Sequence, residues 1–480
     1  MSQLIRVESL SVSTEQGVLV EPVSFELHKG RPLTILGETG AGKSLIAAAL
    51  TGTLPKELKA TGQIYLSERL VSDSELQLTW GKQIALLPQE PWLALDPIMP
   101  VHKQIEEVHT LVNGQTEKQA KPLTEQALQS MNLSKAKSQY PFQLSGGMAQ
   151  RIAYLCATQA GGELLLADEP TKGLDRAHCH IVGDMLAEHA KHEGLITITH
   201  DIELAQNLGG DIIVMKQGAV VESGDTQSVL ANPTLAYTKQ LIESNPRYWT
   251  KRTSAQTQQT LLNVDKLSLQ RNKSTLFNDV SFTLNQGEVL GVCGQSGCGK
   301  TSLADTILGL LTPASGEIVF HQPIAVGQKL KLYQDPPSAF PAHVNLNQLL
   351  RDLQHIHPFD FADIAPLMAR LKLDASLLER TPREISGGEL QRFAILRALL
   401  LKPKLLIADE PTSRLDPITA AETLQLLTSL ATEQQCSLLV IGHDETALEK
   451  LCDKVINLHH FAPETMACSA STTHGVLSHE

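Results

Sequence analysis

The sequence lacks features that define membrane-spanning, disulfide-bonded or polyanion-binding proteins. It has no run of about 18 apolar residues, and its start alternates like a strand without the pattern of a secretory signal, so we expect no membrane-crossing segment. Its seven cysteines are odd in number and form no CxxC pair, which argues against a zinc site or a disulfide framework. The formal net charge of −12 means that the chain has no excess of basic residues to bind a phosphate backbone, so no nucleic-acid partner is expected.

An internal repeat organises the chain. Each half contains, in the same order, a glycine-rich loop, an SGG motif, an apolar run ending in Asp-Glu-Pro-Thr, and a His-Asp pair. These landmarks lie at 37–44, 144–148, 164–171 and 200–201 in the first half and at 294–301, 385–389, 405–412 and 443–444 in the second. The halves are therefore interpreted as paralogous α/β units.

The spacing of the landmarks predicts how the chain is divided. The glycine-rich loop and the SGG motif lie further apart in the first half, which predicts an insertion in its middle segment. We expect a first domain with a C-terminal extension at 1–244, a polar linker at 245–260, a second domain at 261–460 and a flexible tail at 461–480.

Each glycine-rich loop lies between a short apolar strand and a helix start, which is the context of a phosphate loop. Its glycines let backbone N–H groups close on phosphates, while Lys43 and Lys300 reach the β- and γ-phosphates. A plain strand–helix turn is the alternative for one copy, but two copies followed by the same motifs favour the phosphate loop. The predicted nucleotide-binding residues are Gly37, Glu38, Thr39, Gly40, Ala41, Gly42, Lys43 and Ser44, and Gly294, Gln295, Ser296, Gly297, Cys298, Gly299, Lys300 and Thr301.

Adjacent carboxylates end the apolar runs LLLADE and LLIADE. At the end of a buried strand, Asp168 and Asp409 can reach a magnesium shell, while Glu169 and Glu410 can polarise the attacking water. An isolated Asp-Glu pair would more simply be a solvated strand end, but the duplication and the position after the SGG motif favour the catalytic interpretation.

Glutamine and histidine complete each predicted catalytic set. Gln89 and Gln334 lie between an apolar strand and a proline-rich turn, where the amide can contact both magnesium and water. His200 and His443 follow β-rich runs and could hold the γ-phosphate and orient water. Alone, each would be a structural residue; in this order we predict catalytic roles. The predicted magnesium ligands are Ser44, Gln89, Asp168, Thr301, Gln334 and Asp409.

Together with GLD and RLD at 173–175 and 414–416, these motifs resemble the ABC ATPase family over nearly the whole chain. The resemblance implies two P-loop NTPase domains in tandem, each with a RecA-like core, an antiparallel β subdomain and a helical signature subdomain. It also implies head-to-tail packing and two composite ATP sites. Ser145, Gly146 and Gly147 would complete the site on Lys300, and Ser386, Gly387 and Gly388 the site on Lys43. Where the family has an adenine-stacking aromatic, this sequence offers Thr14 and Arg271.

A finer resemblance is to the peptide and nickel importer ATPases, carried by QEPWLALDPIMPVHKQIEE at 89–107, NPTLAYTKQLIESNP at 232–246 and LSGGMAQR. It implies an ATP- and Mg²⁺-dependent energy-coupling subunit for peptides, nickel or metal chelates, peripheral on the cytoplasmic face of the inner (plasma) membrane. Its partners would be two integral-membrane permease subunits and an extracytoplasmic solute-binding protein, and the helical segments at roughly 90–145 and 335–385 would push on the permeases.

Two alternatives from other classes stay open. One is a soluble ABC ATPase acting on a protein assembly, such as a carbon–phosphorus-lyase-like complex or a ribosome; ribosome-acting tandem proteins usually carry a long charged linker, which 245–260 does not supply. The other is a binding-only module, against which both intact Asp-Glu pairs and both histidines argue.

Overall fold

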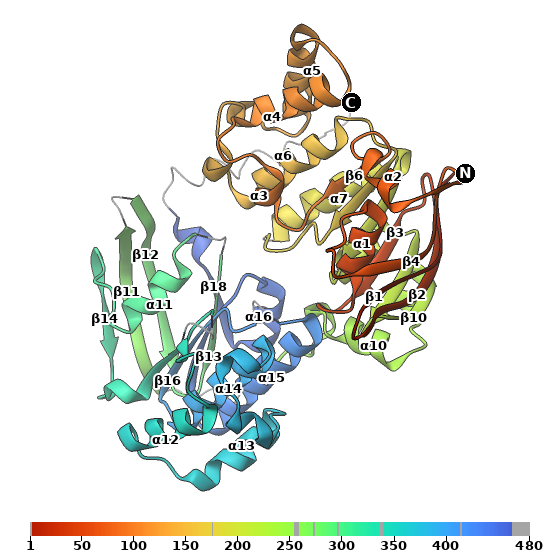
Figure 1. Cartoon of the computed structure of the whole chain (residues 1–480). Helices are drawn as coiled ribbons and strands as arrows, with labels where there is room; N and C mark the ends of the chain where they lie inside the picture. The colour runs from red at the N-terminus through yellow and green to blue at the C-terminus, as the bar shows by residue number, and fades with distance from the viewer. Residues whose placement is uncertain are drawn as a thin grey trace. The chain divides into compact units, whose positions relative to one another are not determined.

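A computed structural model describes residues 2–174, 176–253, 259–271, 274–294, 297–335, 339–412 and 415–462. The chain forms two compact units, Met1–Ile242 (unit 1) and Glu243–Glu480 (unit 2), each described by itself (Figure 1). Among the predicted positions, Gln295, Ser296, Asp175 of the GLD motif, Arg414 of the RLD motif and the tail from 463 lie outside the described residues.

A largely parallel sheet forms the centre of unit 1, in the strand order β10-β9-β3-β8-β7-β6. Its strands are β3 (Leu33–Gly37), β6 (Ile84–Leu87), β7 (Leu164–Asp168), β8 (Gly194–Thr199), β9 (Asp211–Lys216) and β10 (Ala219–Asp225). β3 and β8 are buried along their whole length, including Thr34, Thr197 and Thr199, because a parallel sheet is covered on both faces. All parallel strands end at one edge, where the phosphate loop begins.

A second, antiparallel sheet of unit 1 has the order β2-β1-β4-β5. Its strands are β1 (Gln3–Thr14), β2 (Gly17–His28), β4 (Lys59–Leu66) and β5 (Arg69–Val71). Helix α1 (Lys43–Thr51) joins the two sheets, because Ile46 and Leu50 are fully buried in the core cluster that contains Ile5 of β1 and Ile35 of β3. The phosphate-loop helix is thus fixed by apolar packing on both sides.

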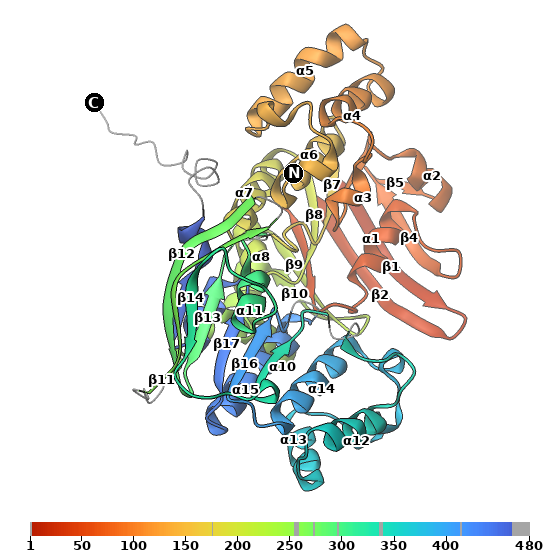
Figure 2. The ribbon, with the colours of Figure 1, turned by 90° about the vertical axis from the view of Figure 1, so that its left-hand side faces the viewer.

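The other helices of unit 1 cover the parallel sheet or extend beyond it. They are α2 (Asp73–Leu78), α3 (Pro91–Ala94), α4 (Val101–Glu107), α5 (Glu117–Ser130), α6 (Gly146–Thr158), α7 (Arg176–His192), α8 (Ile202–Leu208), α9 (Thr226–Ala231) and α10 (Ala236–Glu243). In both views α4 and α5 lie beyond α6, away from the strands (Figures 1 and 2). This is the helical part predicted at roughly 90–145.

Unit 2 repeats this arrangement with a parallel sheet β15-β16-β17-β13-β18 and an antiparallel sheet β12-β11-β14. The strands are β11 (Thr260–Arg271), β12 (Ser274–Asn285), β13 (Val289–Cys293), β14 (Ser315–Phe320), β15 (Lys329–Leu332), β16 (Leu405–Asp409), β17 (Ser437–Ile441) and β18 (Lys454–Asn457). The helices are α11 (Lys300–Ile307), α12 (Leu346–Ile356), α13 (Ile364–Arg370), α14 (Gly387–Leu400), α15 (Pro417–Glu433) and α16 (Glu445–Leu451). The predicted tandem α/β fold is confirmed.

The expected insertion in unit 1 includes β5 and α2. In unit 2 the chain between β14 and β15 forms only the short 3₁₀ turn Val326–Gln328. Helix α2 is stabilised at its start by Glu75, which accepts hydrogen bonds from both the backbone N–H and the hydroxyl of Ser72.

Trp249, inside the segment predicted as a linker, is buried in the core cluster of unit 2. Its indole N–H donates to the carbonyl of Glu243 over 3.2 Å, and Arg252 N–H donates to the carbonyl of Lys450. The start of unit 2 is therefore packed on its own core, while the predicted domain boundaries stay a prediction.

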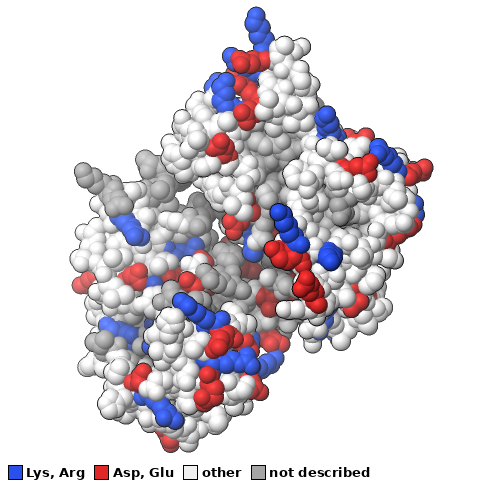
Figure 3. Space-filling view, in the orientation of Figure 1, with Lys and Arg blue, Asp and Glu red and all other residues white. Residues whose placement is uncertain are grey.

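On the surface, acidic and basic side chains are interspersed over the visible face of each unit (Figure 3). Within the described parts of the chain, no helix combines the length and the apolar character that crossing a membrane requires.

Candidate functional site

The glycine-rich loop of unit 1 connects β3 to α1. Gly40 and Gly42 adopt the left-handed backbone conformation, with φ of 86° and 91°, which strains any other residue. A Cβ built on Gly40 would meet no atom within 4 Å, so the loop leaves open space beside it. Lys43 is buried and its Nζ donates to the carbonyls of Gly37 and Glu38 over 2.8 and 2.9 Å. Burial lowers the pKa of Lys43, and this curled loop around a lysine suits a phosphate group.

Oxygen ligands gather next to this loop. Ser44 Oγ donates to Asp168 Oδ1 over 3.3 Å, which brings together a hydroxyl and a carboxylate. Such hard oxygen donors are the ligands that Mg²⁺ prefers. Burial raises the pKa of Asp168 despite the hydrogen bond from Ser44, so the carboxylate is poorly solvated by its surroundings. The pair fits a magnesium ion.

Glu169 follows β7 in a left-handed conformation with φ of 47°. Its Oε2 lies 2.7 Å from His200 Nδ1, and its Oε1 lies 3.6 Å from Lys43 Nζ. Burial acts to raise the pKa of Glu169, but the hydrogen bonds and charge of His200 and the charge of Lys43 outweigh it and lower that pKa. A carboxylate that stays ionised beside the phosphate loop can accept a proton from water.

Unit 2 places its loop in the same way. Lys300 Nζ donates to the carbonyl of Gly294 over 2.7 Å, and Gly297, with φ of 83°, again borders open space. Thr301 Oγ1 donates to Asp409 Oδ1 over 3.2 Å, the counterpart of the Ser44–Asp168 pair. The second site therefore holds the same donor set for phosphate and magnesium.

The catalytic candidates of unit 2 are connected differently. Glu410 Oε2 accepts a hydrogen bond from Gln334 Nε2 over 2.6 Å, and its Oε1 lies 4.0 Å from Lys300 Nζ. His443 is exposed and, although both residues are described, no hydrogen bond or ion pair joins it to Glu410. In unit 1, Gln89 is half-buried behind β6, and it is the histidine that contacts the glutamate.

The SGG motifs begin helices in both units. Ser145 is the N-cap of α6, where its hydroxyl accepts from Met148 N–H, and Ser386 is the N-cap of α14. Ser386 also donates its hydroxyl to Glu389 Oε2 over 2.6 Å, a pair that Met148 cannot form in unit 1. The predicted glycines Gly146, Gly147, Gly387 and Gly388 form the first turns of these two helices.

Two residues that the sequence analysis missed contact the predicted sites. Tyr237, on α10 of the C-terminal extension, accepts a hydrogen bond at its hydroxyl from Glu38 N–H of the phosphate loop over 3.2 Å. Lys331, on β15, lies 3.1 Å from Asp409 Oδ2 and 2.7 Å from Asp305 Oδ1. Burial acts to lower the pKa of Lys331, but both carboxylates outweigh it and raise that pKa. The sequence signal for this contact was the charged Lys331 in KLKLYQ, because the corresponding segment of the first half, IALLPQ, has leucine at that position.

The adenine-stacking positions lie where strands turn. Thr14 ends β1 and donates its hydroxyl to the carbonyl of Gly17 over 3.3 Å, and Arg271 ends β11 with an exposed side chain. Neither is an aromatic residue.

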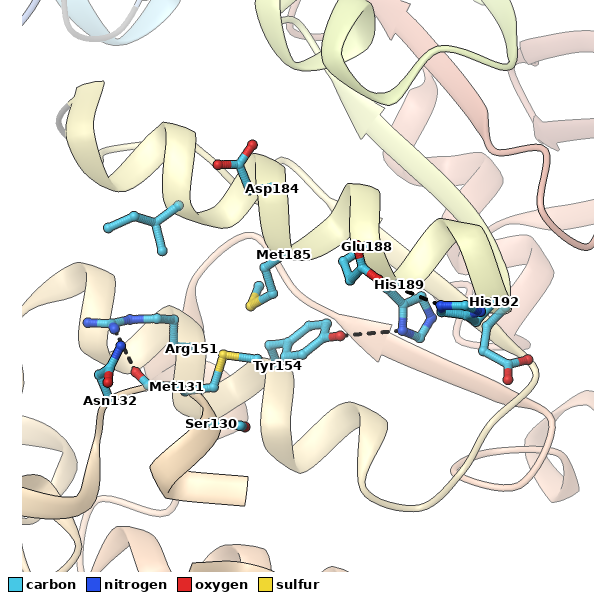
Figure 4. Close-up of a pocket in the computed structure, with 12 residues that line it drawn as sticks. Ser130, Met131, Asn132, Arg151, Tyr154, Asp184, Met185, Glu188, His189 and His192 are labelled. Atoms are coloured by element: carbon cyan, nitrogen blue, oxygen red, sulfur yellow. Dashed lines mark hydrogen bonds and ion pairs between the residues drawn. The ribbon is translucent and has the colours of Figure 1, made fainter. Parts of the chain in front are cut away.

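A separate pocket of about 530 Å³ lies in unit 1 between α6 and α7 (Figure 4). Arg151 donates to the carbonyl of Met131 on one side, and Tyr154 Oη lies 3.4 Å from His189 Nδ1 on the other. No predicted site residue lines this pocket, so it is distinct from the phosphate-loop site.

Two α/β units, each with a lysine in a glycine-rich loop at the carboxyl edge of a parallel sheet, define a tandem P-loop nucleotide-binding protein. A family model described as "ABC transporter" matches residues 20–172 and 277–413. The chain belongs to the ABC transporter family, and it is an ATP-binding protein that hydrolyses ATP.

Several relatives match nearly the whole chain. The uncharacterized ABC transporter ATP-binding protein YejF of Escherichia coli (strain K12) is 32% identical over 95% of this chain and 94% of that protein. The peptidoglycan transport ATP-binding protein YejF of Agrobacterium fabrum is 29% identical over 95% and 91%. The glutathione import ATP-binding protein GsiA of Salmonella typhi is 30% identical over 91% and 81%.

Among solved structures, one titled "RNase-L Inhibitor" has a TM-score of 0.64 at 20% identity, covering 93% of this chain and 87% of that one. At this identity the likeness supports the tandem fold alone.

Proposed function

We propose that the chain is the ATP-hydrolysing, energy-coupling subunit of an importer for peptide-type solutes. Two relatives that match over nine-tenths of the chain are named for peptidoglycan transport and glutathione import, which favours peptides over the nickel and metal-chelate cargoes that the sequence also allowed. The observation that carries the proposal is the presence in both units of a loop lysine, a hydroxyl–aspartate pair and a neighbouring glutamate.

In this proposal each loop holds the phosphates of one ATP. Lys43 and Lys300 would bind phosphate oxygens in place of their loop carbonyl partners, and the pairs Ser44–Asp168 and Thr301–Asp409 would hold magnesium. Bound ATP would supply the phosphoanhydride bond that is cleaved, with Mg²⁺ neutralising its phosphate oxygens.

Glu169 and Glu410 each accept a proton from the attacking water. His200 holds Glu169 in place through the 2.7 Å contact, and Gln334 does the same for Glu410 through its 2.6 Å hydrogen bond. We assign Gln89 and His443 to positioning water and the γ-phosphate, since each follows a strand of the parallel sheet that carries the loop.

The two ATP sites are composite in this proposal. Ser145, Gly146 and Gly147 at the start of α6 complete the site on Lys300, and Ser386, Gly387 and Gly388 at the start of α14 complete the site on Lys43. A helix N-terminus presents free N–H groups and a favourable dipole to phosphate, which suits this role. ATP binding then closes the two units and hydrolysis releases them.

The partners are two integral-membrane permease subunits and an extracytoplasmic solute-binding protein. The helical parts, α3 to α5 in unit 1 and α12 to α13 in unit 2, contact the permeases and transmit the closure to them. The chain is then peripheral on the cytoplasmic face of the inner (plasma) membrane.

The transport role can be tested by purifying the affinity-tagged chain from detergent-solubilised membranes of its native cells. Co-purification of two polytopic membrane proteins is expected. Recovery instead with a soluble enzyme such as a carbon–phosphorus-lyase-like complex, or with ribosomes, and without polytopic subunits would overturn the proposal.

A further inference from the structure

A buried cation lies against the second site. The side chain of Lys331 is only 5% exposed, and its ammonium group lies between Asp305 Oδ1, at 2.7 Å, and Asp409 Oδ2, at 3.1 Å. The ring of Tyr333 approaches the same ammonium, with its centroid 5.4 Å from Nζ. Asp409 therefore has both carboxylate oxygens engaged, because Oδ1 accepts the hydrogen bond of Thr301.

Unit 1 has no equivalent cation at this position. Lys331 pairs with Ile407 in the sheet of unit 2, and in unit 1 the residue paired with the equivalent Leu166 is Leu86. Asp305 lies at the helix position that Ala48 occupies in α1. The Lys–Asp pair is thus an addition to one site of an otherwise repeated set.

We propose that Lys331 places a permanent positive charge at the second site. Its ammonium group binds one carboxylate oxygen of Asp409 and thereby weakens divalent-cation binding at this site relative to the first site. This inference rests on the proposed function, in which Asp409 and Thr301 hold magnesium. It goes beyond that function by assigning the two sites different affinities for the metal.

The physical reason is charge at short range. A divalent cation held by Thr301 and Asp409 would share that carboxylate with the ammonium on its Oδ2, and the two positive charges would repel. Because the ammonium is buried, solvent and salt screen this repulsion poorly. Asp305 offsets part of it, since its carboxylate lies 2.7 Å from the ammonium.

The test measures metal binding directly on the full chain with Lys43→Ala, which removes the phosphate-loop lysine of the first site. Manganese replaces magnesium, and bound Mn²⁺ is counted by loss of the free-ion signal in electron paramagnetic resonance, with a non-hydrolysable ATP analogue present. Fluorescence titration with a labelled ATP analogue measures nucleotide binding separately.

Lys331→Leu, which installs the residue of unit 1, is expected to tighten nucleotide-dependent Mn²⁺ binding by about fivefold or more. Asp305→Ala is expected to weaken it, because the ammonium loses its offsetting carboxylate. The double variant should fall between them. Lys329→Leu, two residues away on β15 with its ammonium on the Phe320 ring, is the matched control and should leave Mn²⁺ binding unchanged.

Unchanged or weaker Mn²⁺ binding in Lys331→Leu, with nucleotide binding intact, would overturn the inference and leave the proposed function standing. Failure of every variant, including the Lys43→Ala parent, to bind nucleotide would instead overturn the proposed function and this inference with it. If Lys331→Leu raises the affinity for Mn²⁺ and Asp305→Ala lowers it, the effect is electrostatic, because general loss of structure would lower the affinity in both variants.

Discussion

His200 Nδ1 lies 2.7 Å from Glu169 Oε2, whereas the corresponding histidine in unit 2, His443, is exposed and is not joined to Glu410. The same motif thus supports two local arrangements, one in which the histidine contacts the glutamate and one in which Gln334 does.

Replacing the glutamates tests whether both sites hydrolyse ATP. Glu169→Gln and Glu410→Gln should each remove at least about half of the phosphate release of the assembled complex, and the double variant should lose about 100-fold, because general-base catalysis is lost. Glu163→Gln, an exposed position just before β7, is the matched control. If one single variant kept full turnover, its site would be regulatory and the symmetric mechanism would fail.

Replacing the histidines tests whether the contact in unit 1 tunes the base. His200 helps to lower the pKa of Glu169, so in His200→Ala burial is less opposed and that pKa rises. A base with a raised pKa is protonated at higher pH, so the acid limb of the turnover-against-pH profile should move upward.

The same substitution in unit 2, His443→Ala, provides the comparison. His200→Ala is measured in a Lys300→Ala background and His443→Ala in a Lys43→Ala background, so that only one site is active in each variant. His443→Ala should leave the acid limb in place because His443 does not contact Glu410. Equal shifts in both variants would contradict the asymmetry.

Tyr237→Phe tests whether the C-terminal extension stabilises the phosphate loop. The change removes the hydroxyl that accepts the hydrogen bond from Glu38 N–H. A hydrogen bond of this kind contributes about 1 kcal/mol, so nucleotide should bind about fivefold more weakly to the first site. Titration of a fluorescent ATP analogue in a Lys300→Ala background measures this site. Tyr248→Phe, an exposed tyrosine, should bind normally; equal binding by the Tyr237 variant would show that the loop does not need the contact.

Trp249→Ala tests the packing at the start of unit 2. Removing a buried indole leaves a cavity and should lower the free energy of unfolding of this unit by about 3 kcal/mol or more, seen as a lower melting temperature in calorimetry. The neighbouring exposed Tyr248→Ala should change it by less than about 0.5 kcal/mol. Similar small effects of both changes would mean that the segment is a solvated connection.

The fold was predictable because its signals are local. Short, mainly apolar runs ending in glycine or aspartate specify buried parallel strands, and the doubled motif order specifies two units. The longer middle segment of unit 1 was equally visible, but the spacing of motifs does not show that it forms a short strand and a capped helix. The polar composition around Trp249 predicted a linker, but its one large apolar side chain is buried in the core of unit 2.

The site was predictable only to the level of its motifs. Glu169 contacts the histidine of its motif set, whereas Glu410 contacts the glutamine, although both sets hold the same residue types. Tyr237 contacts Glu38 of the loop although the two residues are 199 positions apart in the sequence. Lys331 contacts Asp409 only because β15 lies beside β16. Such contacts arise from tertiary packing that periodicity and spacing do not encode.

The Lys331–Asp305 pair has a consequence for how the two halves can evolve. If identical subunits from one gene formed the dimer, any cation placed beside the metal aspartate would appear at both sites. Since one chain carries both halves in fixed one-to-one stoichiometry, a mutation in either half alters a single site. Gene fusion thereby allows the two ATP sites to diverge while every assembled molecule still contains one of each.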